Sequence, residues 1–69
     1  MFDMFLAICA MTALDCNAIY VRYGNPGYDN VAIAGIGESG AYHIVIDRDV
    51  RRKSRSFVRQ LLVHEIAHL

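Results

Sequence analysis

Apolar residues form one long run near the N-terminus, three short runs in the middle of the chain and a helical pattern at its end. Residues 5–14 are almost entirely apolar, which favours a helix. Residues 18–23, 31–36 and 42–47 are short runs rich in β-branched and aromatic residues, separated by glycine-containing turn clusters at 24–27 and 37–40. The order helix, three strands, helix predicts an α+β fold with a small three-stranded sheet, and no repeat or interdomain linker interrupts it.

The last helix is predicted to follow a loop at residues 47–55. Ser54 or Ser56 can cap it, and it continues to the end of the chain. Residues placed at 100° steps give the helix an apolar side made of Val58, Leu62, Ile66 and Leu69, and a second side made of Phe57, Leu61, His64 and His68. Val63 and Ala67 cover much of the remaining surface, so the pattern predicts an interior helix.

The N-terminal apolar run has two interpretations, a signal peptide core or a buried helix. An acid, Asp3, stands where a signal peptide carries a Lys or Arg, and Asp15 ends the run before the length of about 20 residues that a membrane span needs. A buried helix is favoured, and no membrane span is expected. In a helix over residues 2–16, Cys9 and Cys16 lie about 10.5 Å apart along the axis, too far for a disulfide, so they are interpreted as small buried hydrophobic residues.

Size and charge restrict the function. A chain of 69 residues holds one small domain, and its hydrophobic content of 55% excludes a disordered segment. The formal net charge is zero. Six of the seven basic residues gather in the loop and the start of the last helix: Arg48, Arg51, Arg52, Lys53, Arg55 and Arg59. Without interleaved aromatic residues or a net positive charge, this cluster indicates a solvated loop and no nucleic-acid partner.

The candidate chemistry lies in residues 63–69, which read VHEIAHL. His64 and His68 are four positions apart, so on a helix they project from one face and can hold one Zn²⁺ through their ring nitrogens. Glu65 lies about 100° round the helix from His64, beside the ion, where its carboxylate can accept a proton from water. The spacing therefore predicts His64 and His68 as metal ligands and Glu65 as the catalytic base.

The alternative is that these are polar residues near a fraying chain end. Three fixed residues, two of them His, match by chance in roughly one chain of this length per thousand. Polar groups in a helix that is apolar nearly all round are costly unless a ligand binds them. A zinc site is therefore the favoured interpretation.

On the motif His64-Glu65-Ile66-Ala67-His68 the chain resembles the zincin metallopeptidases, and among them metzincins of the matrixin type. The resemblance covers most of the chain and implies a zincin-like catalytic domain over residues 1–69 that hydrolyses peptide bonds in protein or peptide substrates. It also implies that residues 41–46 form the edge strand that pairs with extended substrate. Structural Ca²⁺ occurs near a similar strand in that family, but the spacing of His43, Asp47 and Asp49 departs from the family pattern. An extracellular setting is consistent with the resemblance, while the residues leave the compartment open.

The chain departs from the family after the second His, where metzincins continue with a Gly and a third His ligand. No third ligand follows Leu69, and His43, the only other histidine, lies upstream of the motif. The expectation is a metallopeptidase domain that is incomplete at its C-terminus. The alternative is a truncated remnant or a weak metal-binding domain without turnover.

Overall fold

The sheet has three strands, and the last of them along the chain lies in the middle. The computed structural model describes residues 1–27 and 30–69. β1 (Ile19–Gly24), β2 (Ala32–Ile36) and β3 (Tyr42–Asp47) are arranged in the order β1-β3-β2. β1 runs parallel to β3 and β2 runs antiparallel to it, so the sheet is mixed. The three predicted strands are confirmed within a residue of the expected ends.

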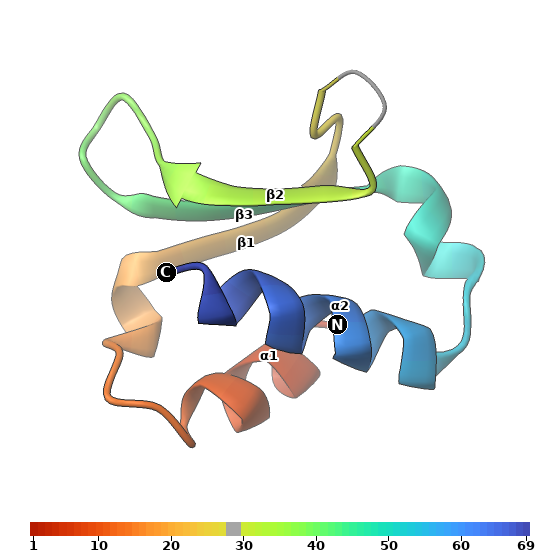
Figure 1. Ribbon diagram of the computed structural model, residues 1–69, viewed down its shortest axis with the longest axis horizontal. Helices are drawn as coiled ribbons and strands as arrows, with labels where there is room; N and C mark the ends of the chain where they lie inside the picture. Colours follow the sequence, from red (N-terminus) through yellow and green to blue (C-terminus); the bar gives the residue numbers. More distant parts are fainter. Residues whose placement is uncertain (28–29) are drawn as a thin grey trace.

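Successive side chains of each strand point to opposite faces of the sheet, and the helices cover one of these faces; Val45 of β3 points to the other face and is 7% exposed. Ile44 and Ile46 in β3 are fully buried, and Ile19 of β1 lies on the same side. Both helices cover this face, as Figure 1 shows. The core between the layers is formed by Phe5, Cys9, Ile19, Ile44, Ile46, Val50, Val58, Leu62 and Ile66. The chain is therefore an α+β domain of two layers, with helices on one side of the sheet only.

The first helix is shorter than predicted. α1 covers Phe2–Cys9, and the chain then turns, because the Thr12 hydroxyl and the Thr12 amide both donate hydrogen bonds to the Cys9 carbonyl, at 2.6 and 2.9 Å. The side chain of Asp15 accepts a hydrogen bond from the Asn17 amide and begins the short 3-10 helix η1, Cys16–Ala18. Polar side chains that bond to nearby backbone compete with the helix, and here they end it.

The interpretation of the two cysteines as unpaired residues is wrong. The turn after α1 reverses the chain, so the Cα atoms of Cys9 and Cys16 lie 5.9 Å apart and the two side chains form a disulfide. The separation expected along a continuous helix does not apply, since residues 10–15 are not helical. The disulfide links the end of α1 to η1, directly before β1.

The second helix follows a capped connection. Residues 47–55, predicted as a loop, contain the 3-10 helix η2 (Arg48–Arg52), which begins where the Asp47 carboxylate accepts a hydrogen bond from the Asp49 amide at 2.9 Å. α2 then covers Arg55–Ala67, and Ser54 is its N-cap. The six clustered basic residues are all exposed, which confirms the prediction of a solvated cluster. No helix in the described parts of the chain has the length and apolar character needed to cross a membrane.

Candidate metal centre

The orientation of α2 decides which residues of the motif face water. Val58, Leu62 and Ile66 pack into the core, as the predicted apolar side requires. The helix is not an interior helix, however, because the sheet and α1 cover only part of its circumference. Phe57 and Val63 are 40% and 47% exposed, so the prediction of burial all round is wrong. His64 and His68 lie on the exposed side of α2.

The two histidines converge at one point on that exposed side. Their Nε2 atoms are 3.0 Å apart and the rings meet edge to face at 73°, with 4.6 Å between the ring centroids. At this distance one ring N–H donates a hydrogen bond to the other ring nitrogen. Two nitrogen ligands at about 2.0–2.1 Å from a tetrahedral ion lie about 3.3 Å apart. The separation of the two Nε2 atoms is therefore close to that of two nitrogen ligands on one ion.

Glu65 lies on the adjoining side of the helix and is buried. It is 6% exposed and is the one buried charged residue among the described residues. In the described parts of the chain no buried side-chain oxygen or nitrogen lacks a hydrogen-bond partner, and no hydrogen bond is made by the Glu65 carboxylate. The Glu65 side chain is therefore held by packing on the side of α2 that adjoins His64.

No third ligand joins the pair within residues 1–27 and 30–69, where no group of three or more His, Cys, Asp and Glu side chains could hold a metal ion. His43 lies on β3 between Tyr42 and Ile44, and its ring stacks on the Tyr20 ring with 5.2 Å between the ring centroids. This is the open face of the sheet, whereas α2 covers the other face. His43 therefore cannot complete the centre, and the sheet separates it from His64 and His68.

His43 is also distant from Asp47 and Asp49, the two acidic residues considered with it as possible calcium ligands. Asp47, four residues further along β3, lies about 13 Å away along the strand, and its carboxylate caps η2. Asp49 follows in η2. The structure thus brings Asp47 and Asp49 together at the start of η2 and leaves His43 apart from them, so the three residues do not form a calcium site.

The strand that the family resemblance predicts to pair with substrate is not at the edge of the sheet. β3, which includes nearly all of residues 41–46, is hydrogen-bonded to β1 on one side and to β2 on the other. Its backbone groups are already paired, so the prediction that residues 41–46 bind extended peptide is wrong. The antiparallel edge strand is β2, which contacts α2, the helix that carries the motif.

Comparison of the chain with protein families, with curated proteins and with solved structures found no match. The chemistry of the site therefore rests on the residues themselves. Sequence reasoning missed two features near α2: the disulfide and an apolar groove between α1 and α2. The signal for both was present in Thr12 and Asp15, polar residues that favour a turn and stand within or at the end of the apolar run.

Proposed function

We propose that the chain carries the two-histidine part of a catalytic zinc centre and that its activity is peptide-bond hydrolysis. The observation that carries the proposal is the convergence of the His64 and His68 Nε2 atoms to 3.0 Å on the exposed side of α2. The next residue after the first ligand is a buried carboxylate, Glu65. The motif and its resemblance to zincin metallopeptidases of the matrixin type supply the reaction class.

The three residues have two different roles, metal binding and proton transfer. His64 and His68 would hold the ion through their ring nitrogens. Zinc, when bound, polarises the substrate carbonyl and lowers the pKa of its water toward about 7. Glu65 accepts a proton from the attacking water and returns it to the leaving amine. Packing of the Glu65 side chain fixes the carboxylate, so little conformational freedom is lost when it acts.

Extended substrate would pair with β2 through main-chain hydrogen bonds. β2 is an antiparallel edge strand, and a peptide added to it continues the sheet. α2, the helix that carries the motif, is in contact with β2. The proposed substrate-binding strand is therefore Ala32–Ile36, in place of residues 41–46.

A metal-binding element without turnover is the second candidate. It is favoured by the lack of a third ligand among the described residues, since catalytic zinc sites have three protein ligands. The two candidates agree about metal binding and differ about hydrolysis, so the test must measure both.

Calorimetric titration with Zn²⁺ is the first measurement. The chain should bind Zn²⁺ more weakly than nanomolar, because two protein ligands leave the remaining positions to water. His64→Ala should abolish binding. His43→Ala is the matched control and should leave it unchanged, since His43 lies on the other face of the sheet. Nanomolar affinity that is lost in His43→Ala would overturn the two-ligand assignment.

The second measurement concerns Glu65 in a form of the protein that includes a third ligand. Glu65→Gln should keep zinc content nearly intact and lower casein hydrolysis at least about a hundredfold, because an amide cannot accept the proton. His64→Ala should lose zinc and hydrolysis together. Full zinc content with full turnover in Glu65→Gln would show that the peptidase proposal is wrong, and zinc binding without turnover in the unsubstituted form would favour the second candidate.

A further inference from the structure

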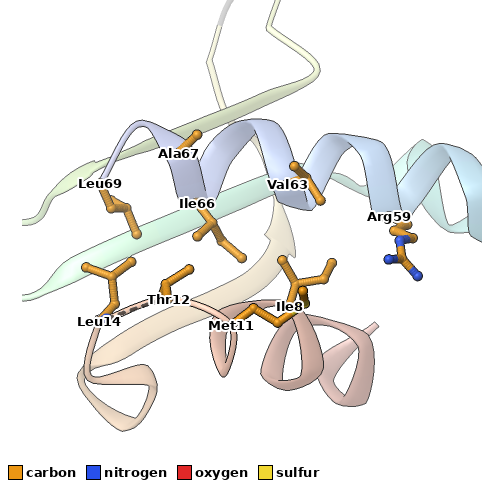
Figure 2. A pocket seen from close by; sticks show the side chains of 9 residues that line it. All are labelled: Ile8, Met11, Thr12, Leu14, Arg59, Val63, Ile66, Ala67 and Leu69. Carbon is orange, nitrogen blue, oxygen red and sulfur yellow. Dashed lines mark hydrogen bonds between the residues drawn. The ribbon is translucent and has the colours of Figure 1, made fainter.

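An apolar groove runs between α2 and the end of α1 with the turn that follows it. It has a volume of about 490 Å³. Ile8, Met11 and Leu14 form one wall, and Val63, Ile66 and Leu69 form the other, as Figure 2 shows. The motif residues His64, Glu65 and His68 do not line it. The groove is therefore a separate feature of the same helix.

The walls of the groove offer almost no hydrogen-bonding group. Thr12 is the one uncharged polar residue in the lining, and its hydroxyl is already engaged, donating to the Cys9 carbonyl and accepting from the Leu14 amide. Met11 is 84% exposed, and Val63 on the opposite wall is 47% exposed. A ligand that lies along these walls gains by covering apolar surface and finds no partner for polar groups of its own.

One end of the groove carries a cation. Arg59 lines this end, four residues before Val63 on α2, and Leu69 lies at the opposite end. No acidic residue is among the described residues that line the groove, so nothing in the lining neutralises Arg59. A guanidinium group binds carboxylates with two parallel hydrogen bonds. The groove is thus apolar along its length and complementary to a negative charge at one end only.

Its size suits a small molecule better than a protein surface. A stable protein interface involves about 20–30 residues and about 800 Å² on each partner. The groove is lined by nine residues of a chain whose total accessible surface is 4877 Å². Small-ligand pockets measure about 300–1,000 Å³, a range that includes this groove. Arg59 and Leu69 are ten positions apart, which corresponds to about 15 Å of helix.

We propose that this groove binds an alkyl carboxylate, with its chain against Met11, Val63 and Leu69 and its carboxylate on Arg59. The proposal does not depend on the zinc centre. His64→Ala should bind the ligand as the unsubstituted chain does, so the two proposals fail or hold separately.

Decanoate, below the concentration at which it forms micelles, is the probe. Calorimetric titration of the 69-residue chain should give one saturable site. Decanol tests the carboxylate and should bind at least about tenfold more weakly, since it lacks the charge-assisted bond to Arg59. Acetate, which has no alkyl chain, and decyltrimethylammonium, which has the opposite charge, should not bind measurably.

Substitutions then separate the two parts of the site. Arg59→Gln should lower the affinity for decanoate about tenfold and leave that for decanol unchanged. Val63→Asp should abolish binding of both. Arg55→Gln is the matched control, because Arg55 is an exposed arginine of the same helix outside the groove. Circular dichroism of each variant establishes that it is folded.

Three results would overturn the proposal. Equal affinity for decanoate in Arg59→Gln and in the unsubstituted chain would show that the charge plays no part. Lack of saturable decanoate binding in the folded chain would show that the groove is not a ligand site. Sedimentation that finds a dimer, converted to a monomer by Val63→Asp, would show that a second copy of the chain covers the groove.

Discussion

The two helices differ in how far their own residues determine where they end. α2 begins at a Ser cap, and its apolar residues Val58, Leu62 and Ile66 recur at helical spacing, so local sequence defines its start and predicts the side that packs into the core. α1 has no side-chain cap at its start, and its apolar sequence continues beyond the point where the helix stops. A turn and a disulfide determine that end instead. The end of a helix can be predicted from the sequence where a capping residue and polar residues define it. It is harder to predict where a contact with a residue seven positions away, here the disulfide, determines the end.

The largest expected effect tests whether α1, whose end is not defined by local sequence, is needed for the stability of the fold. Phe5 in α1 is fully buried against the sheet and α2, while Phe2 on the same helix is 57% exposed. Phe5→Ala should lower the free energy of unfolding by about 3–5 kcal/mol, because it removes a buried ring and leaves a cavity. Urea unfolding measures this loss. Leu62→Ala, the corresponding change in α2, should cost about 2–5 kcal/mol.

Phe2→Ala is the matched control within α1 and should change the free energy of unfolding by less than about 1 kcal/mol. A small effect of Phe5→Ala beside a large effect of Leu62→Ala would mean that α1 contributes little to the core. The chain would then have one helix packed stably on the sheet and one loosely attached N-terminal segment.

The next effect concerns the disulfide that ends α1. Closing a loop with a sequence separation of seven residues stabilises the folded chain by about 2.4 kcal/mol in the chain-entropy treatment. Reduction of the Cys9–Cys16 bond should lower the unfolding midpoint accordingly. Hydrogen exchange should show protection lost first in α1 and the turn at residues 10–15, while α2 keeps its protection.

The variant in which both cysteines are replaced by Ala is the control for reduction, and a reductant should not change its unfolding midpoint. An unchanged midpoint on reduction of the unsubstituted chain, with two thiols titratable beforehand, would mean that the cysteines are separate. Because disulfides persist in oxidising compartments, a confirmed bond would also favour an extracellular or periplasmic setting.

Sequence reasoning succeeded where the determining contacts are local. Short runs of β-branched and aromatic residues between glycine-containing turn clusters located the three strands. The spacing of His64 and His68 predicted a shared face of α2, which the structure confirms. Strand order was not readable in this way, because the same apolar pattern suits an edge or a central strand. Residues 41–46 were placed at the edge by the family resemblance, and the strand order shows that this placement is wrong.

The buried position of Glu65 and the groove beside Val63 could not be read from the helical pattern alone. Apolar residues at several positions around the axis of α2 predict that the whole helix is buried. Which side remains exposed depends on how many other elements pack against the helix, and the sequence pattern does not give that number. Here the sheet covers one side and α1 part of another. The exposed remainder carries both the histidine pair and one wall of the groove.

The smallest expected effect tests the start of α2, which has a side-chain cap, whereas α1 has none. The sequence left Ser54 and Ser56 as alternative caps. The Ser54 Oγ atom accepts a hydrogen bond from the Phe57 amide at 3.2 Å, which satisfies one of the free N–H groups in the first turn. Ser54→Ala should therefore cost about 1 kcal/mol of unfolding free energy. Ser56 lies inside the helix and is exposed, so Ser56→Ala should be neutral or stabilise the chain by a few tenths of a kcal/mol, since Ala has the higher helix propensity. Urea unfolding of the two variants under one condition measures the difference. Equal losses in both would mean that the helix start is not held by a side-chain cap, and that α2 is no better marked than α1.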